Sequence, residues 1–368
     1  YSICDKMESG QKTKKTIKNI EGFYMNPKEK ISMKDIAKLA GVSASTVSRI
    51  INNSGQISEK TKKKVFSLMK KYNYTPNMVA KSLKINKSKS IGIIITNIQN
   101  EFFSEIVLGI EDFFFKVGYS VFICNTSQNP KKEMEYFKIL DSKLVDGIIC
   151  ISALEKTPKD FYSNHRKIPM VCIDRIFDPH ASDTFYVESS HFDGGFLATE
   201  ELIKKGCRKI MILTKKRSFS ASQKRFEGYK EALKKYDIPF DANLVMKFDG
   251  NLSSFDETKK IVDKAVSSGL EFDGIFATSD WRAYGALISL KEHGISVPEK
   301  VKIIGFDNIS ISKYSYPKIT TVNQDREAII QQVSNLLFDL MNDAELPDEI
   351  KNKKHIVIPV SLVNRETT

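Results

Sequence analysis

Long apolar segments are absent from this sequence. No run of apolar residues approaches the about 20 residues that a membrane-spanning helix requires. The N-terminal residues also lack the apolar core of a signal peptide. We therefore expect a cytoplasmic protein that does not insert into a membrane.

Residue patterns typical of enzymes and metal sites are also lacking. There is no GxSxG, no GxxxxGK[ST] and no GxGxxG after an expected strand, and the five histidines form no recognisable dyad. The five cysteines include no CxxC pair, and Cys124, Cys150 and Cys172 lie in apolar strand-like runs. We expect reduced, mostly buried cysteines and neither catalysis, cofactor nor metal. Turnover of sugars by the purified protein would revive the enzyme alternative.

Positive charge is concentrated in the first quarter of the chain. The 368 residues carry a net charge of +12, and this length suits two or three domains. Residues 1–90 contain twenty Lys/Arg against six Asp/Glu, whereas the remainder contains 37 against 39. A basic N-terminal segment on a near-neutral body predicts a polyanionic partner for that segment alone.

The segment 33–83 begins with a helix-turn-helix pattern. Apolar residues recur at helical spacing up to Ala40, and Gly41 follows, where a helix prefers a left-handed residue. Ser43 stands where an N-cap belongs and opens a second helix over 44–51. Ser58 opens a third helix, which carries a lysine run at 62–64. In such a unit the second helix enters the major groove of DNA by its N-terminal end.

Three motifs then resemble the headpiece of the LacI/GalR family of transcription regulators. They are D-I-A-x-x-A-G-V-S-x-x-T-V-S-R (35–49), N-N (52–53) and Y-x-Y-x-P-N-x-x-A-x-x-L (72–83). The resemblance implies base reading by Ala44 and Ser45, guanine reading by Arg49, and phosphate contacts from Ser43 and Thr46. It also implies a hinge helix over 76–84 that folds on operator DNA, with Leu83 as a minor-groove wedge. The complete implied DNA-binding set is Ser43, Ala44, Ser45, Thr46, Ser48, Arg49, Asn77, Lys81, Leu83 and Lys84.

After residue 90, apolar strand-like runs alternate with amphipathic helices. The runs are 91–95, 119–124, 145–152, 170–174, 209–213, 245–248, 274–278 and 301–307. Helices are expected near 103–117, 130–143, 193–205, 222–235, 254–268 and 281–293. This alternation predicts two doubly wound parallel-sheet lobes, so that the whole chain is an all-α headpiece followed by an α/β core.

Polar residues follow several of these runs, at the strand ends where parallel sheets bind ligands. Aspartate and asparagine can accept sugar hydroxyls, arginine offers a rigid fork, and phenylalanine can lie against a sugar ring. Each residue alone is as readily explained by a helix cap or a salt bridge, but their shared position favours a ligand. The residues are Asn97, Asn100, Phe102, Phe103, Asp174, Arg175, Arg225, Asp280 and Asp307.

The family resemblance covers essentially all of residues 33–366. Segments such as S-x-x-R-x-x-G (222–228), F-D-G-I-F-A-T-S-D-W-R-A-Y-G-A-L (272–287) and I-G-F-D-N (304–308) are similar to family segments. They imply a periplasmic-binding-protein-like core whose lobes are joined near 187–190, 321–323 and 351–354. They also imply effector contacts from Asp174, Arg225, Asp307 and the pair Ser279 and Asp280.

Two departures from the family pattern bear on the effector. The family's V-x-x-D-N-x-x-G-G appears as V-E-S-S-H-F-D-G-G at 187–195, and Gly250 stands where an aromatic residue often stacks on the ligand. The polar, acidic strand ends favour a sugar or sugar derivative. A purine-type corepressor and an activating role remain open. A sugar-binding protein without DNA function would not need the headpiece, and the absence of a signal segment opposes it.

We expect four segments and a dimer. The segments are a flexible basic tail (1–30), the headpiece (31–76), a hinge helix and linker (77–89) and the effector-binding core (90–368). Lobe 1 is expected over about 90–188 and 322–352, and lobe 2 over about 189–321 and 353–368. The expected helix near 103–117 is too apolar for one buried face, which suggests a subunit contact. With no C-terminal heptad helix, a homodimer on a near-palindromic operator is favoured over a tetramer.

Overall fold

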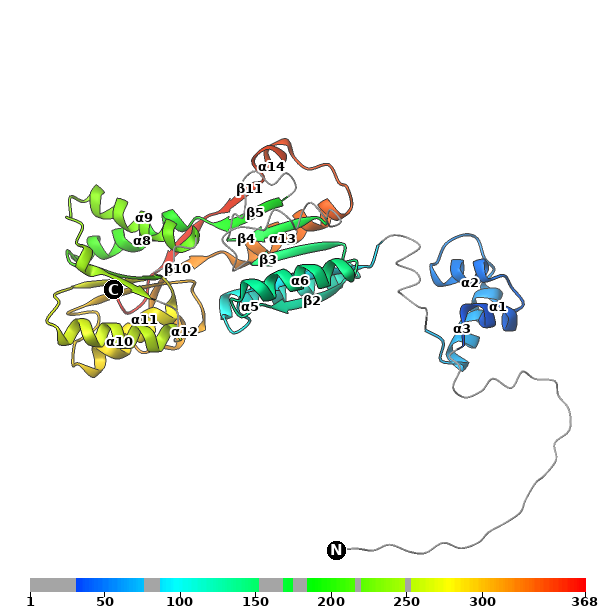
Figure 1. The fold of residues 1–368 in the computed structure, drawn as a ribbon, viewed down its shortest axis with the longest axis horizontal. Coiled ribbons are helices and arrows are strands. Elements are labelled where there is room, and N and C mark those ends of the chain that lie inside the picture. The colour runs from blue at the N-terminus through cyan, green and yellow to red at the C-terminus, as the bar shows by residue number, and fades with distance from the viewer. Residues whose placement is uncertain (1–30, 76–86, 152–167, 175–183, 216–219, 249–252) are drawn as a thin grey trace, which may run out of the picture. The chain divides into compact units, whose positions relative to one another are not determined.

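The computed structural model describes residues 31–75, 87–151, 168–174, 184–215, 220–248 and 253–368. The chain divides into two compact units, Tyr1–Met78 and Val79–Thr368 (Figure 1). The expected tail and the hinge residues Asn77, Lys81, Leu83 and Lys84 lie outside the described residues, as do Arg175 and Gly250.

The first unit contains the helices α1 (Met33–Ala40), α2 (Ala44–Ile51) and α3 (Glu59–Lys71). Ser32 and Asp35 form a capping box on α1, and Gly41 ends that helix in the left-handed conformation at φ +70°. Ser43 accepts the backbone N–H of Thr46 and so caps α2. The predicted helix-turn-helix is therefore present. Its small core consists of Ile36, Ala37, Ala40, Val47, Ile50 and Val65.

Lobe 1 of the second unit is a parallel six-stranded sheet with the order β11-β5-β4-β3-β1-β2. Its strands are β1 (Ser90–Ile95), β2 (Ser120–Asn125), β3 (Gly147–Ile151), β4 (Met170–Ile173), β5 (Thr184–Ser189) and β11 (His355–Ile358). Its helices are α5 (Glu101–Lys116), α6 (Pro130–Ser142), α13 (Arg326–Met341) and α14 (Asp348–Lys353).

Lobe 2 has a sheet of the same size with the order β12-β10-β9-β8-β6-β7, in which β12 is antiparallel to β10. Its strands are β6 (Ile210–Lys215), β7 (Val245–Phe248), β8 (Gly274–Ala277), β9 (Lys302–Phe306), β10 (Thr320–Gln324) and β12 (Val360–Val363). Its helices are α8 (His191–Lys204), α9 (Ser220–Lys235), α10 (Ser254–Ser267), α11 (Asp280–Glu292) and α12 (Ser310–Tyr314), with a short 3-10 turn η1 (Ala242–Leu244). The predicted two-lobed α/β core is confirmed.

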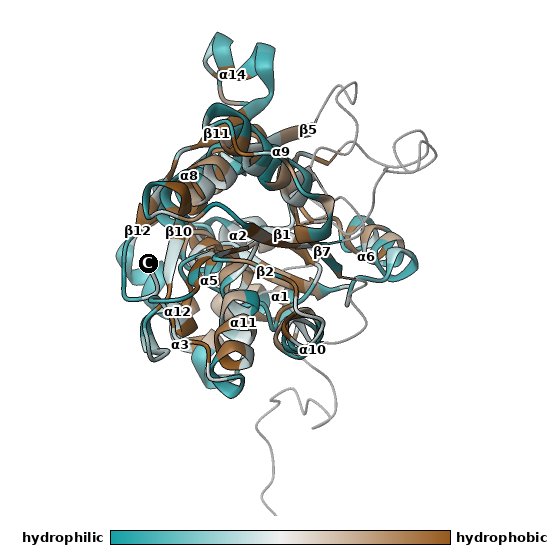
Figure 2. Ribbon diagram, turned by 90° about the vertical axis from the view of Figure 1, so that its left-hand side faces the viewer, coloured by the Kyte–Doolittle hydropathy of each residue, from teal (hydrophilic) through white to brown (hydrophobic). Residues whose placement is uncertain are grey.

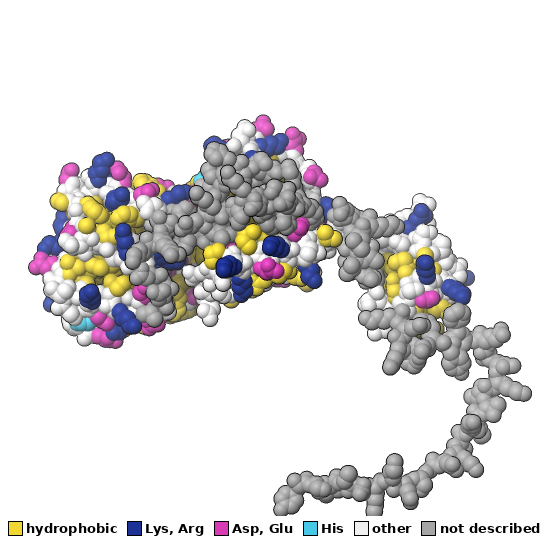
Figure 3. Space-filling model, in the orientation of Figure 1, with side chains coloured by type: hydrophobic (Ala, Val, Ile, Leu, Met, Phe, Trp, Pro, Cys, Tyr) yellow, Lys and Arg dark blue, Asp and Glu magenta, His cyan; other side chains and the backbone are white. Residues whose placement is uncertain are grey.

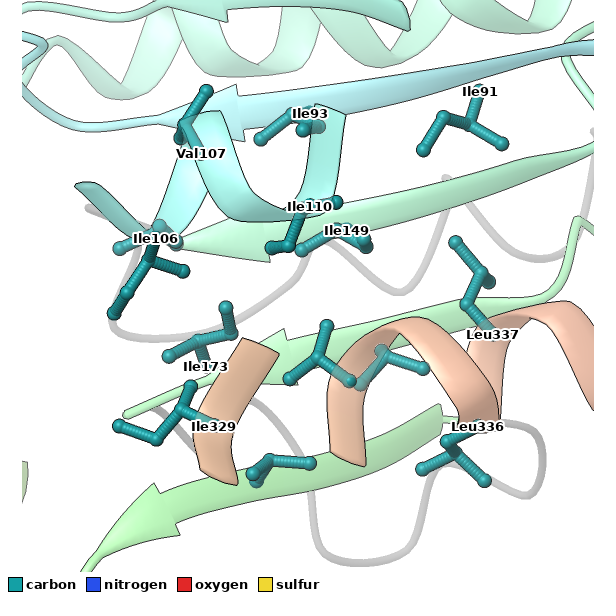
Figure 4. Packing of buried hydrophobic residues seen from close by; sticks show 14 of the residues in the cluster. Ile91, Ile93, Ile106, Val107, Ile110, Ile149, Ile173, Ile329, Leu336 and Leu337 are labelled. Carbon is teal, nitrogen blue, oxygen red and sulfur yellow. The ribbon is translucent and has the colours of Figure 1, made fainter. Parts of the chain in front are cut away.

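Alternate residues of the central strands pack against helices on opposite faces of each sheet. In lobe 1, Ile91 and Ile93 of β1 pack with Ile110 of α5 and with Ile329 and Leu337 of α13 (Figure 4). The other face of that sheet packs against α6. Burial on both faces explains why these strands read as continuous apolar runs. In Figure 2 the central strand β1 is accordingly hydrophobic, whereas α14 is hydrophilic. Cys124, Cys150, Cys172 and Cys207 are reduced and buried, as the sequence predicted for the three strand cysteines.

Four strands, β5, β10, β11 and β12, and the long helix α13 were not anticipated from the sequence. The strands β5 and β10 carry polar residues at buried positions, such as Glu188 and Gln324, which weakens their apolar signal, and β11 and β12 are only four residues long and mostly not fully buried. Because β11 belongs to the sheet of lobe 1 and β12 to that of lobe 2, the chain passes between the lobes at Pro359. The passage expected near 351–354 is therefore wrong. That segment ends α14 within lobe 1.

Candidate functional site

The headpiece presents the N-terminal end of α2 as a polar surface. Ser45 and Arg49 are exposed, and the Ser43 hydroxyl lies 2.7 Å from Ser45 Oγ and 2.8 Å from Thr46 Oγ1. Hydroxyls beside the first turn of a helix suit an anion such as a phosphate. Ala44 is only half-exposed because it also packs against the headpiece core, so its methyl group offers a small apolar contact.

Basic side chains outnumber acidic ones in the described headpiece. Residues 31–75 contain nine Lys/Arg and two Asp/Glu. One of the two acids, Glu59, pairs with Lys62 at 2.8 Å, whereas Lys63 and Lys64 are exposed on the same helix. Figure 3 shows Lys and Arg side chains on the visible face of this unit, next to an apolar patch. Such a surface supplies affinity for phosphates without reading base sequence.

In the second unit, glycines bring α8 and α9 into backbone contact. A Cβ atom on Gly195 would lie 2.1 Å from the Arg225 carbonyl oxygen, and one on Gly228 would lie 2.1 Å from that of Phe192. Real Cβ atoms do not approach so closely, so both positions require glycine. The G-G pair at 194–195 and the S-x-x-R-x-x-G segment at 222–228 thus form a single helix contact. They place Arg225 of α9 beside the first residue of α8.

The Arg225 side chain is buried at the ends of the lobe 2 strands. Its Nη1 donates to the Thr278 carbonyl at 2.7 Å, and its guanidinium carbon lies 3.5 Å from the centre of the Phe306 ring. Nη2 lies 3.6 Å from Asp307 Oδ1. The same nitrogen lies 3.3 Å from His191 Nδ1. This guanidinium therefore organises the site by reaching two strand ends and one helix at once.

His191 connects the two lobes. Its Nε2 lies 2.9 Å from Oδ1 of Asp174, which follows β4 of lobe 1. A guanidinium has only donors, so Nδ1 of His191 must accept from Arg225 and Nε2 must carry the proton donated to Asp174. Burial alone would raise the pKa of Asp174, but His191 and Arg225 outweigh it and the pKa is lowered. A polar chain thus runs from Asp174 through His191 to Arg225 across the lobes.

Asp307 lies at the other side of Arg225. It adopts a positive φ of +105° directly after β9, and its Oδ1 accepts from Gln324 Nε2 at 2.7 Å. Burial raises its pKa to about 6, because the charge of Arg225 offsets only part of the desolvation and Asp174 opposes ionisation as well. Around neutral pH this carboxyl therefore sits close to its titration range.

This pKa predicts a pH-dependent stability. A carboxyl whose pKa is near 6 when folded and 3.8 when unfolded stabilises the fold below pH 3.8, and this contribution is lost as pH rises through 6. The loss amounts to about 3 kcal/mol. Asp307→Asn should remove this part of the pH dependence in chemical unfolding between about pH 4 and 7. The exposed Asp237→Asn should not. Identical slopes for Asp307→Asn and the wild type would contradict the assignment.

Other predicted site residues form contacts within the fold instead of facing a ligand site. Asp280 is fully buried, and its oxygens accept from the Ile309 N–H at 2.8 Å and from Thr321 Oγ1 at 2.5 Å. Burial and Asp307 raise its pKa well above the ordinary value. Phe102 is 2 % exposed in the core of lobe 1, and Asn100 caps α5 by accepting the Phe102 N–H. These three side chains therefore stabilise the fold, whereas Phe103 is half-buried and packs against the core of lobe 1.

Direct contacts also tie the two lobes together near this site. Glu101 of α5 accepts from the backbone N–H and from the hydroxyl of Ser310, both at 2.7 Å. Arg326 at the start of α13 pairs with Glu105 at 2.8 Å and donates to the Asp307 carbonyl at 3.0 Å. A rotation of one lobe against the other must break or lengthen these bonds.

Three residues of the site were missed in the list of expected contacts. His191 was visible only as the departure from the family's D-N pair. Arg282 lies within the S-D-W-R segment but had no separate signal, although its guanidinium is buried near Asp307 and Arg225. Gln324 reaches Asp307 from a strand that was not anticipated.

Comparisons with known proteins agree with this architecture. A family model described as bacterial regulatory proteins, lacI family, matches residues 32–77, and a periplasmic binding protein-like domain matches residues 199–368. An HTH-type transcriptional repressor PurR of Histophilus somni is 32 % identical over 333 residues, which is 89 % of this chain and 96 % of that protein.

Two solved structures are similar as well. One is a periplasmic binding protein/LacI transcriptional regulator from Alkaliphilus metalliredigens complexed with D-xylulofuranose, with 31 % identity and a TM-score of 0.65 over 76 % of this chain and 99 % of that one. The other is the lac repressor dimer bound to operator and the anti-inducer ONPF, with 25 % identity and a TM-score of 0.80 over 92 % and 99 % of the two chains.

The described residues contain neither a membrane-spanning helix nor a metal site. Every helix in that part of the chain is too short or too polar to cross a membrane. No group of three or more His, Cys, Asp or Glu side chains there has the arrangement of a metal site.

Proposed function

The chain belongs to the lacI family of bacterial regulatory proteins and is a DNA-binding transcriptional repressor with a small-molecule effector, and we propose that this effector is a sugar or sugar derivative held between the two lobes. The observation that carries the proposal is the buried polar chain formed by Asp174, His191, Arg225 and Asp307 at facing strand ends. We further propose that the protein acts in the cytoplasm, as the family's role in transcription requires.

For the DNA, we propose the contacts that the headpiece geometry supports. The exposed Ser45 and Arg49 read base edges in the major groove, with the Ala44 methyl group against a thymine methyl. Ser43 and Thr46 bind phosphate at the start of α2, and Ser48, half-exposed on the same helix, lies within the groove. Asn77, Lys81, Leu83 and Lys84 belong to the proposed hinge that enters the minor groove.

For the effector, we propose that the sugar takes the place of water around Asp174, Arg225 and Asp307. Each can form a charged hydrogen bond to a hydroxyl, and bonds of this kind are about twice as strong as neutral ones. Ser279, half-buried before α11, and Phe103 complete the proposed surroundings, whereas Asn100, Phe102 and Asp280 support them indirectly. The similarity to a regulator solved with D-xylulofuranose supports a carbohydrate.

We propose that effector binding is coupled to DNA through lobe rotation. The interlobe bonds of Glu101, Arg326 and His191 provide a set of contacts that one arrangement of the lobes satisfies. A ligand that binds one arrangement better shifts the population toward it, which requires a difference in affinity between the two states. The hinges of the two subunits would then gain or lose their contact on the operator.

The proposal is tested by a thermal-shift screen of sugars, sugar phosphates and nucleobases with the full chain. Each hit is then added to a fluorescence anisotropy titration with inverted-repeat oligonucleotides selected from a random pool. A sugar that shifts both the melting temperature and the operator affinity supports the proposal. Nucleobases as the sole hits would favour the purine-type corepressor. Absence of any preference for inverted repeats over random DNA would refute a specific repressor.

Exposed apolar side chains on lobe 1 support a homodimer. α5 buries Ile106 and Ile110 in the lobe but leaves Leu108 65 % and Phe115 71 % exposed. The neighbouring edge strand β2 exposes Phe122 and Ile123 as well. Water-exposed apolar surface of this extent marks an interface, and an operator with two half-sites needs two headpieces. We propose that α5 and β2 of two subunits pack together.

Replacing Phe115 with lysine is expected to weaken the dimer by roughly 30-fold or more, because burying an ammonium without a partner is costly. Analytical ultracentrifugation over a concentration series measures the change. The control is Val357→Lys on β11, which is equally a solvent-exposed apolar residue but lies at the opposite edge of the same sheet. An unchanged sedimentation profile for Phe115→Lys would place the interface elsewhere.

A further inference from the structure

Arg282 is a buried cation that forms no ion pair with a carboxylate of the described residues. Its side chain lies in the first turn of α11 and is 6 % exposed. In the part of the chain that the structure describes, no Asp or Glu oxygen lies within 4.0 Å of its guanidinium, and Nε has no hydrogen-bond partner. Burying an unpaired charge costs several kcal/mol, so a group in this state requires an explanation.

The guanidinium is directed at the N-terminal end of its own helix. Nη1 donates to the Ser279 hydroxyl at 3.1 Å, and Ser279 is the N-cap residue of α11. The Ser279 side chain accepts no backbone N–H of the helix. Within the described residues the N–H groups of Asp280 and Trp281 donate no hydrogen bond. The first turn of this 13-residue helix therefore offers free donors.

The one acid of that turn does not neutralise it. The Asp280 carboxyl is directed away, toward Thr321 and the Ile309 N–H, into space that Gly305 leaves open. A Cβ atom on Gly305 would lie 2.3 Å from Asp280 Oδ1. Burial also raises the pKa of Asp280, which favours its neutral form. The positive end of the helix dipole consequently faces the site without a compensating charge.

A second guanidinium, that of Arg225, lies next to the first turn of α11. Arg225 donates to the carbonyl of Thr278, the residue before Ser279, at 2.7 Å. Burial lowers the pKa of Arg282 to about 10; Asp307 opposes this shift, and the charge of Arg225 adds to it. Both arginines remain cations at neutral pH. The Arg282 guanidinium and the helix N-terminus thus meet at Ser279, and Arg225, which already faces Asp307 at 3.6 Å, lies one residue away at Thr278. A second cation beside a helix N-terminus favours an anion.

We propose that the effector carries an oxyanion, either a phosphate or a carboxylate, which binds to Arg282, the Ser279 hydroxyl and the free N–H groups of α11, with Arg225 beside it. This inference rests on the proposed function and narrows its ligand class from sugars in general to anionic sugar derivatives. The remaining polar chain of Asp174, His191 and Asp307 then binds the uncharged hydroxyls of the same molecule.

Matched probes test the inference with the full chain. Isothermal titration and thermal shift compare glucose with glucose 6-phosphate and gluconate, ribose with ribose 5-phosphate, and inorganic phosphate alone. The anionic member of a pair should bind, and Arg282→Met should weaken that binding roughly 10- to 100-fold, because charged hydrogen bonds are lost. Ser279→Ala should weaken it less. Lys291→Gln, with the same change of charge at the far end of α11, should have no effect.

The unliganded variant gives a second measurement. Arg282→Met removes a buried charge without a carboxylate partner, so it should unfold at the same or a higher temperature than the wild type. The inference is overturned if no anionic probe stabilises the wild type more than it stabilises Arg282→Met, or if neutral and anionic members bind equally. Operator binding distinguishes failure of the anionic-effector proposal from failure of the proposed repressor function. A wild-type protein that prefers an inverted repeat keeps the proposed function even when no anionic effector binds.

Discussion

Operator affinity is expected to fall by about 1,000-fold or more when monovalent salt rises from about 50 to 200 mM, provided that two headpieces together contact six or more phosphates. The reason is the release of counterions from DNA by the lysine-rich headpiece, whose described residues carry nine basic side chains and two acidic ones. Fluorescence anisotropy titrations at several salt concentrations give the slope. A flat dependence would contradict an interface built on phosphate contacts.

A double variant locates the effect. Lys63→Gln with Lys64→Gln removes two exposed charges from α3 and should lower the slope by up to about 0.9 for each phosphate contact that is lost. Lys230→Gln, an exposed lysine of α9 in the core, should leave the slope unchanged. If both variants changed the slope equally, the attraction would come from the whole protein rather than from the headpiece. The near-neutral charge of the core makes that outcome unexpected.

Replacing Arg225 with methionine is expected to abolish the effector response, with a loss of more than about 100-fold in effector affinity. The guanidinium contacts Thr278, His191 and the Phe306 ring and at the same time faces Asp307. Its removal leaves buried carboxylates without their cation, which should also destabilise the core by about 3–5 kcal/mol. Operator binding itself should persist, because the headpiece is a separate unit.

Thermal shift and anisotropy titrations with and without effector measure these effects. Arg225→Lys is the informative companion, because it keeps the charge but not the planar fork that reaches three partners. It should recover stability more than effector affinity. Lys230→Met, exposed on the same helix, controls for the loss of a positive charge. An effector response of wild-type size in Arg225→Met would show that the ligand binds away from this arginine.

Arg225 owes its position to packing between helices rather than to its immediate neighbours in the chain. The backbone contact of α8 and α9 at Gly195 and Gly228 fixes the position of the Arg225 guanidinium relative to the strand ends. Alanine at either glycine would force the helices apart and move Arg225 from His191. Gly195, Gly228 and Arg225 therefore act together. The glycines set the spacing of the helices, and Arg225 extends into the site.

The headpiece could be derived from the sequence because its determinants are local. Helix caps at Ser43 and Ser58 and the left-handed Gly41 act within a few residues of the chain, so reading along the sequence recovers them. The same holds for the separation of charge between headpiece and core, and for the strand and helix alternation of both lobes. A strand that is buried on both faces can be recognised from its continuous run of apolar residues.

The chemistry of the interlobe site was decided by the tertiary structure. His191 meets Asp174 from 17 positions away, and Arg225 meets Thr278 from 53 positions away, so no local pattern announces either pair. The same long-range packing turned Asp280 away from the site, buried Phe102 in the core and left Nε of Arg282 without a hydrogen-bond partner among the described residues. A side chain's type sets which bonds it can form. Its partners depend on how distant strands and helices meet, and this is settled only when the whole chain folds.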